Sequence, residues 1–413
     1  MSIVLIALPA TADDYIDQKP LTEIVVPQVR DCRTLDEIRI PLRTSGGDII
    51  TLYGNQYDTE TSAGGPYHAN GLKVSLVLQN DIGDQLEAFL TCETPVMKAS
   101  QGMLNVVADI TEADARTEMV GVFQYGWSNG GAVLVARPDI EQPADLLGST
   151  IVTQAYGPHL GYLARVLADA RIGVENEGGA WVEPTVRYTE DLLGFDQGAP
   201  ASAFLKDEEV DAAFVGKADA DILTAGDVGT GAEGSVRGAH ALMSTKSASR
   251  LISDVLVVRR DYLEANPDQI EALIKATFEA EELLREDVVK QIVPWDEIAG
   301  VLLGDDGAIE EVKDLWRLYE TVGLKGNVDW ATDGQPRSFK AVNDDIQSYL
   351  VETGLLAGAH ELAVVDWDFR AEFGDEIFDE RMAALPAFDD NQSSNAVGQL
   401  REAGDVGQNT LFT

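Results

Sequence analysis

The chain has 413 residues, of which 45% are hydrophobic, so it can bury a sizeable core, and its length favours two lobes over one compact domain. Its 71 acidic and 30 basic residues give a formal net charge of −41. Because phosphate binding relies on clustered Lys and Arg, a chain this acidic should repel nucleic acid and anionic membrane surfaces. We therefore expect no nucleic-acid partner.

Residues 1–14 read MSIVLIALPATADD, a short apolar run followed by Ala-Thr-Ala and two aspartates. This pattern predicts a signal-peptide remnant over residues 1–12, with cleavage near Ala12. No Lys or Arg precedes the apolar run, so a strand is the alternative. No other stretch approaches the roughly 18 apolar residues of a membrane span. We expect a soluble mature protein that is periplasmic or secreted.

Cys32 and Cys92 are the only cysteines. Their wide spacing excludes a metal cluster of the CxxC type. Export would permit a disulfide between them, and two separate buried thiols are the alternative, because sequence does not give the distance between their Cα atoms. Neither cysteine has a catalytic context.

Strands and helices alternate from Leu35 onward, as is typical of parallel α/β sheets. The pattern predicts strands over residues 35–42 and 72–78, with a long loop or insertion at 54–70 between them. A helix is expected over 84–90, and the stretch 101–108 is expected to open another. We assign residues 35–136 to the first lobe.

A second α/β lobe is predicted over residues 137–249, after the apolar strand 133–136. A short helical turn at 142–148 opens this lobe, and its later strands and helices are expected at Ile151, 158–170, Val186, 199–206 and 211–215. The apolar strand 251–259 should return the chain to the first lobe, so that two crossings form a hinge.

The first lobe then resumes as residues 250–360 with additional C-terminal helices. The first of these helices begins with Asn266 at the cap and Pro267 at the first position, and Ile270, Ile274 and Phe278 lie on its apolar face. The tail 387–413 is rich in Asp, Asn, Ser and Gly, and we expect it to be disordered.

Three polar, glycine-bearing loops flank strands: 44–48 (TSGGD), 125–131 (YGWSNGG) and 154–159 (QAYGPH). In the third loop a Gly-Pro pair opens a helix, whose free N–H groups can hold a polar ligand group. Because ligands collect beyond the carboxyl ends of strands in open α/β sheets, these loops are expected to line one pocket. The predicted ligand-binding residues are Ser45, Gly46, Asp48, Tyr125, Trp127, Ser128, Gln154, Tyr156, His159 and Asp219.

Six of these residues also have a purely structural interpretation. Ser45 and Asp48 suit a helix cap, and Asp219 suits an exposed cap. Tyr125 and Trp127 are either cleft aromatics or core residues beneath their loop. His159 is either a ligand donor or a surface or capping residue.

No arrangement of residues predicts catalysis. The four histidines His68, His159, His240 and His360 lack metal-ligand spacing, and no serine or cysteine lies in a nucleophile motif. The stretch GTGAEG at 229–234 lacks the lysine of a phosphate-binding loop. We expect no enzyme activity, no cofactor and no metal site.

The ordered blocks of residues 123–268 resemble the substrate-binding components of ABC importers of the nitrate/taurine (NitT/TauT) type. The resemblance rests on YGWSNGGAVLVARPDI, PADLLGSTI, QAYGPHLGYLARVLADA, DEEVDAAFVGKADA, VGTGAEGSVRGAHALMSTK and SDVLVVRRDYLEANP, with weaker likeness in SQGMLN and LRTSGGD. Residues from 361 onward and the first thirty or so fit no pattern of the family.

This resemblance implies an α/β, two-lobe periplasmic-binding-protein-like fold of type II, with a hinge. It also implies two lobes that close on a small polar solute and deliver it to a membrane permease, and we expect the protein to be a monomer. Two alternatives remain at this point: an enzyme on the same fold, similar to a pyrimidine-precursor synthase, and a ligand-sensing module that signals through a protein partner.

Overall fold

The structure is a computed structural model that describes residues 15–171, 182–189, 198–232 and 234–377. The predicted signal-peptide remnant at 1–12 and the predicted tail at 387–413 lie outside these residues. Within them the chain forms two compact units. The larger unit contains Lys19–Ser128 and the described residues from Ile252 onward, and the smaller unit contains residues 15–18 together with Asn129–Leu251.

The larger unit contains a two-stranded sheet and a five-stranded sheet. Its parallel strands β1 (Ile38–Leu42) and β2 (Val74–Leu78) pair with each other, and β1 also lies beside β3 (Val96–Ser100). Strand β10 (Ser253–Arg259) runs antiparallel between β3 and β4 (Met119–Ser128). Two short strands also pair with β4, namely β11 (Tyr319–Thr321), which is antiparallel to it, and β12 (Ala363–Val364), which is parallel to it. The predicted strands at 35–42, 72–78 and 251–259 are confirmed.

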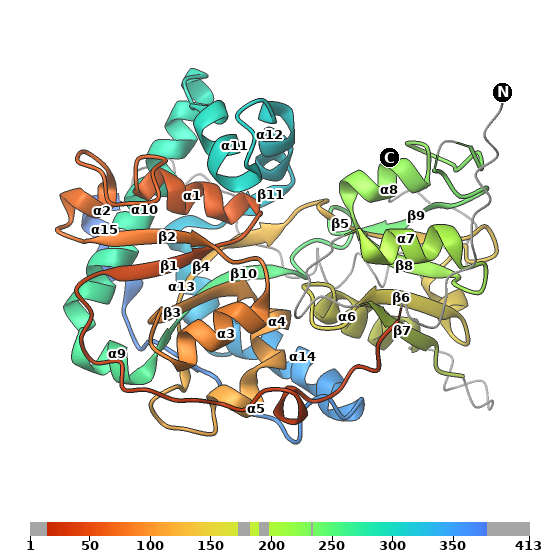
Figure 1. Cartoon of the computed structure of the whole chain (residues 1–413), viewed down its shortest axis with the longest axis horizontal. Helices are drawn as coiled ribbons and strands as arrows, with labels where there is room; N and C mark the ends of the chain where they lie inside the picture. Colours follow the sequence, from red (N-terminus) through yellow and green to blue (C-terminus); the bar gives the residue numbers. More distant parts are fainter. Residues whose placement is uncertain (1–14, 172–181, 190–197, 233, 378–413) are drawn as a thin grey trace. The chain divides into compact units, whose positions relative to one another are not determined.

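Helices surround the sheets of the larger unit (Figure 1). The amino-terminal part contributes η2 (Leu21–Glu23), α1 (Gly46–Gly54), α2 (Pro66–Ala69), α3 (Ile82–Leu90), α4 (Gln101–Val106) and α5 (Ala108–Thr111). The carboxyl-terminal part contributes α9 (Arg260–Ala265), α10 (Pro267–Lys290), α11 (Trp295–Leu303), α12 (Ile309–Arg317), α13 (Gly323–Ala331), α14 (Phe339–Glu352) and α15 (Phe369–Ile377). The predicted loop at 54–70 thus contains α2, which begins with Pro66 at its first position.

The long helix α10 packs its apolar face into the core of the larger unit against α1. Ile270, Leu273, Ile274 and Phe278 are all buried there, as their helical spacing predicts. The predicted cap is only partly correct. Asn266 occupies the cap position, but its side chain makes no capping bond and instead donates to the carbonyl oxygens of Arg33 and Tyr262.

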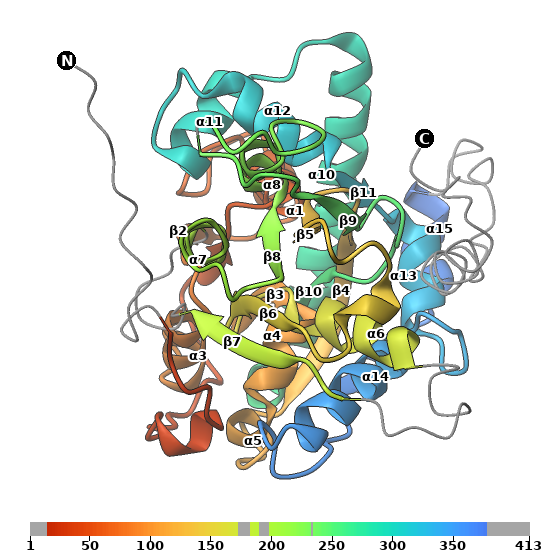
Figure 2. The same ribbon diagram turned by 90° about the vertical axis from the view of Figure 1, so that its right-hand side faces the viewer.

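The smaller unit contains a five-stranded sheet of order β7-β6-β8-β5-β9. Its elements are β5 (Ala132–Ala136), η3 (Pro143–Leu146), β6 (Thr150–Gln154), α6 (Leu160–Arg171), β7 (Thr185–Thr189), α7 (Ala199–Lys206), β8 (Ala212–Gly216), α8 (Lys217–Leu223) and β9 (His240–Ser244). Strand β6 is parallel to both β7 and β8, and β5 is antiparallel to β8 and β9. Figure 2 shows α6 and α7 flanking this sheet.

Two features of the chain path differ from the sequence prediction. Strand β5, which we assigned to the first lobe, belongs to the smaller unit because it pairs with β8 and β9. Within the described residues the chain also passes between the units three times rather than twice, since residues 15–18 belong to the smaller unit. The Ile16 N–H donates to the Tyr188 carbonyl, and the Tyr15 hydroxyl donates to the Asp207 carboxylate. These two bonds hold the N-terminal segment on the smaller unit.

A disulfide joins Cys32 to Cys92, which decides between the two alternatives left open by the sequence. It links the segment before β1 to the turn that follows α3. The Cys32 N–H also donates to the carboxylate of Asp261. The bridge therefore fixes the stretch around Cys32, which precedes β1, onto the rest of the larger unit.

Candidate functional site

Polar side chains gather at one edge of the two neighbouring sheets of the larger unit, β1-β2 and β11-β4-β10-β3. Strands β1, β3 and β4 reach this edge with their carboxyl ends, and β10 begins there because it runs antiparallel. Register places Asp254 opposite both Ser100 and Gly126, and Ser253 opposite Trp127. Residues from four separate parts of the sequence thus meet where open α/β sheets bind ligands.

Helix α1 begins at this edge, directly after β1. Ser45 is its cap residue by position, and Gly46 and Gly47 form its first turn. Tyr319 of β11 packs against this turn, so a Cβ atom on Gly46 would lie only 2.5 Å from Tyr319 Cβ, and one on Gly47 would lie 2.7 Å from the Tyr319 hydroxyl. The two glycines are therefore required by close packing.

Lys98 and Asp48 form an ion pair beneath the first turn of α1. The Nζ–Oδ1 distance is 2.8 Å, and each side chain is 1% exposed. Lys98 Nζ also donates to the Gly47 carbonyl and the Thr51 hydroxyl, and it lies 3.7 Å from the centre of the Tyr125 ring. Burial raises the pKa of Asp48 and lowers the pKa of Lys98, and the pairing opposes both shifts.

Arg43 and Asp254 form a looser pair beside Ser45. Arg43 Nη1 lies 3.5 Å from Asp254 Oδ1, and the two side chains are about one-tenth exposed. The Ser45 hydroxyl lies 3.0 Å from Asp48 Oδ2 and 3.1 Å from Asp254 Oδ2. Because a hydroxyl carries one proton, it can donate to only one of these carboxylates at a time.

The predicted residues of the second loop lie on β4. Tyr125 is fully buried, with its hydroxyl accepting a hydrogen bond from Thr51. Trp127 is 4% exposed, and Ser128 is partly exposed where β4 ends. The structure therefore brings Ser45, Gly46, Asp48 and Tyr125 together around Lys98, with Trp127 and Ser128 further along the same strand.

The remaining predicted residues belong to the smaller unit. Gln154 ends β6, and Tyr156 follows it in the loop before α6; both are buried. His159 is 8% exposed, and its ring stacks on Phe214 of β8 with centroids 5.9 Å apart. Asp219 lies in the first turn of the short helix α8 and is partly exposed.

Sequence reasoning missed four polar residues of the sheet edge: Arg43, Lys98, Asp254 and Tyr319. Two of them carried a signal. Lys98 and Asp254 are charged residues within otherwise apolar strands, where an unpaired charge would be costly. Tyr319 gave no signal, because it belongs to a three-residue strand more than 190 positions beyond Ser128, with which it pairs.

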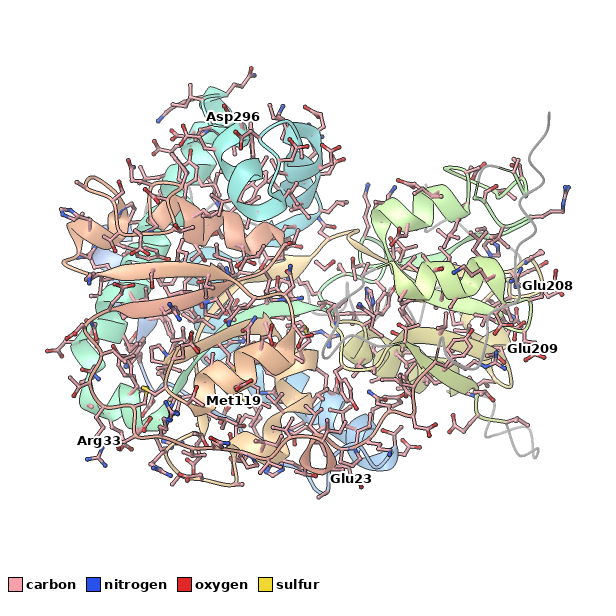
Figure 3. The ribbon with its side chains drawn as sticks, in the orientation of Figure 1. Glu23, Arg33, Met119, Glu208, Glu209 and Asp296 are labelled. Carbon is pink, nitrogen blue, oxygen red and sulfur yellow. A yellow bond between two sulfur atoms is a disulfide. The ribbon has the colours of Figure 1, made fainter. Side chains whose placement is uncertain are left out.

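Within the described residues, no group of three or more His, Cys, Asp or Glu side chains is arranged to hold a metal ion. None of the described helices combines the length and apolar character needed to cross a membrane. Acidic side chains lie on the periphery of both units, and Figure 3 shows examples at Glu208, Glu209 and Asp296. The ionic groups of the candidate site are, in contrast, buried and paired.

No family model matches the chain, and no curated protein matches it by sequence. Solved structures do match. The periplasmic aliphatic sulphonate binding protein SsuA from Escherichia coli shares 14% identity over 81% of this chain and 95% of its own, with a TM-score of 0.53. The alkanesulfonate-binding protein SsuA from Xanthomonas axonopodis pv. citri, solved with bound MOPS, shares 14% identity over 80% of this chain and 98% of its own, with a TM-score of 0.52.

The chain has the α/β fold of periplasmic binding proteins. A third structure, the periplasmic sulfonate-binding protein SsuA from Methylobacillus flagellatus KT, agrees at 16% identity over 83% of this chain and 95% of its own, with a TM-score of 0.52. At these identities the likeness establishes the fold. The fold implied by the resemblance to NitT/TauT components is confirmed, and all three of these proteins are binding proteins by name.

Proposed function

We propose that the protein is an extracytoplasmic solute-binding protein of the NitT/TauT type. It would capture a small polar molecule between two closing lobes and deliver it to the membrane permease of an ABC importer. The observation that carries this proposal is a periplasmic-binding-protein fold with a buried polar cluster at the sheet edge where α1 begins. The disulfide between Cys32 and Cys92 supports export, because such bonds persist in oxidising compartments.

Binding rather than catalysis is the activity that this site supports. Its polar groups are Arg43, Ser45, Asp254 and the buried Lys98–Asp48 pair. The three structures reported above that share this fold are binding proteins by name, which supports this choice. Residues Gln154, Tyr156, His159 and Asp219 of the smaller unit are proposed to complete the ligand shell, and the protein is proposed to act as a monomer.

A thermal-shift screen tests the proposal. The purified chain is screened against nitrate, sulfonates, amino acids, amines and pyrimidines, each at low and high salt. A ligand present at about a hundred times its dissociation constant should add roughly 2.7 kcal/mol to the free energy of unfolding. A rise for one class supports solute binding. If a folded, monomeric preparation responds to no compound at either salt concentration, the solute-binding function is contradicted.

A further inference from the structure

Arg43 is a buried arginine with unused hydrogen-bonding capacity. Its side chain is 9% exposed, and its Nε atom is buried without a hydrogen-bond partner. Its contact with Asp254 is 3.5 Å long, beyond the usual hydrogen-bond range of about 2.7–3.2 Å. A guanidinium group has five N–H donors in a planar fork that matches a carboxylate or sulfonate. Arg43 can therefore bind the anionic end of a solute.

Asp254 has the complementary capacity. An ionised carboxylate offers about four acceptor positions on its two oxygens. One oxygen of Asp254 faces the Ser45 hydroxyl at 3.1 Å, and among the described residues the other has only the long contact with Arg43. A buried carboxylate with free acceptor positions favours a cationic donor such as an ammonium group. Asp254 can therefore bind the cationic end of the same solute.

Lys98 takes no part in this recognition. An ammonium group has three N–H donors, and Lys98 directs them to Asp48, the Gly47 carbonyl and the Thr51 hydroxyl. Asp48 in turn is 1% exposed, beneath the first turn of α1. The Lys98–Asp48 pair is thus buried and its ammonium donors are used. The hydrogen-bonding groups left for a ligand are those of Arg43 and Asp254.

The four ionic groups of the cluster carry two positive and two negative charges. A solute that carries a net charge would therefore leave one buried charge uncompensated, which is costly in an interior of low dielectric constant. A solute with one positive and one negative group keeps the balance. It can also place each group on the side chain of opposite sign.

Resting on the solute-binding function proposed above, we propose that the site is specific for small zwitterions that have no net charge. The carboxylate or sulfonate of the solute accepts hydrogen bonds from Arg43, and its ammonium group donates to Asp254. The observations that carry the proposal are the buried, unpartnered Nε of Arg43 and the 3.5 Å separation of the two side chains.

Two sets of matched compounds test the specificity by isothermal titration calorimetry. Taurine is compared with isethionate, which lacks the ammonium group, and with ethanolamine, which lacks the sulfonate. β-Alanine is compared in the same way with hydroxypropionate and aminopropanol. Loss of one partner from a buried charge pair costs at least about 2 kcal/mol, so each singly charged analogue should bind about thirtyfold more weakly than its zwitterion.

Variants assign the two ends of the solute. Asp254→Asn should reduce the preference for taurine over isethionate by about thirtyfold, and Arg43→Gln should reduce the preference for taurine over ethanolamine by the same factor. Arg39→Gln is the matched control, because Arg39 lies on β1, which ends just before Arg43, but forms an exposed pair with Glu93. It should leave both preferences unchanged. These ratios are measured within one variant, so a general loss of stability does not alter them.

The outcomes separate the two proposals. Zwitterions that bind more tightly than both analogues, with the expected changes in the variants, support the specificity. Equal binding of isethionate or ethanolamine overturns the specificity and leaves the solute-binding function standing. If none of the six compounds binds but a compound of another class raises the melting temperature in the thermal-shift screen, the specificity is likewise overturned and the solute-binding function stands. If nothing in either panel binds to the folded protein, both proposals fall.

Discussion

Lys98 and Asp48 form a buried ion pair, 2.8 Å from Nζ to Oδ1, that fastens the first turn of α1 to strand β3. Such a pair is weak evidence for stability as a whole, but removal of one partner leaves an uncompensated charge. Lys98→Met should lower the free energy of unfolding by about 3–5 kcal/mol at neutral pH. Urea unfolding followed by circular dichroism measures this loss.

An exposed ion pair provides the control for Lys98→Met. Lys340 pairs with Asp344 one helical turn away in α14, and both side chains are about half exposed. Lys340→Met should leave stability almost unchanged, because solvent screens such pairs. Combining Lys98→Met with Asp48→Asn should recover part of the loss, since no charge then remains buried. If Lys98→Met and Lys340→Met lower the free energy of unfolding by similar amounts, the Lys98–Asp48 pair is not structurally important.

Gly46 is predicted to tolerate no side chain. A Cβ atom there would lie 2.5 Å from Tyr319 Cβ and 2.6 Å from the Leu315 carbonyl oxygen, neither of which is the end of a flexible side chain. Gly46→Ala should therefore displace β11 and cost about 1–3 kcal/mol of stability. The melting temperature measures this cost. Gly358→Ala is the control, because nothing lies within 4 Å of a Cβ atom there, and an equal loss in that variant would contradict the packing explanation.

The sequence predicted most elements of the fold because their patterns are local. The apolar strand 251–259 is buried at every position of β10, and the spacing of Ile270, Leu273 and Phe278 matches the buried face of α10. The loop at 44–48 was correctly placed at the start of a helix after a strand. These features depend on side chains within one or two turns of each other.

The composition of the site could not be predicted because it depends on the register of distant strands. Asp254 meets Ser45 only because β10 lies antiparallel between β3 and β4, with Asp254 opposite Ser100 and Gly126. Periodicity gives no register between strands more than 120 residues apart. The same limit explains why Asp48 was predicted as a ligand without its partner Lys98. The one clue in the sequence was that Lys98 is a charged residue within an otherwise apolar strand, where it needs a partner.

Tyr15 should contribute to the alkaline sensitivity of the protein. Burial, together with the hydrogen bond to Asp207, raises the pKa of Tyr15 from 10.0 to about 12. The unfolded chain therefore loses this proton at lower pH than the folded chain. The stabilising contribution is complete below pH 10.0 and is lost as the pH rises to about 12. Tyr15→Phe should reduce the fall in melting temperature across this range.

An absorbance titration of tyrosinate checks the assignment of that change to Tyr15. The other tyrosines with a raised pKa, such as Tyr67 and Tyr262, are present in both proteins and cancel in the comparison. Asp207→Asn removes the negative charge beside the Tyr15 hydroxyl and should shift this titration to lower pH. If the wild type and Tyr15→Phe lose stability equally between pH 10.0 and about 12, the hydroxyl of Tyr15 is not protected in the folded state.

The disulfide between Cys32 and Cys92 should contribute strongly to stability. The two residues are 60 positions apart, and in the chain-entropy model a closed loop of that length destabilises the unfolded state by about 4 kcal/mol. Replacement of both cysteines by serine should lower the free energy of unfolding by about this amount. A reducing agent should have the same effect on the wild type and none on the double variant. If reduction leaves the urea midpoint of the wild type unchanged, the N-terminal segment is held by other contacts, such as the Arg259 bonds to the Arg30 carbonyl and to Asp261.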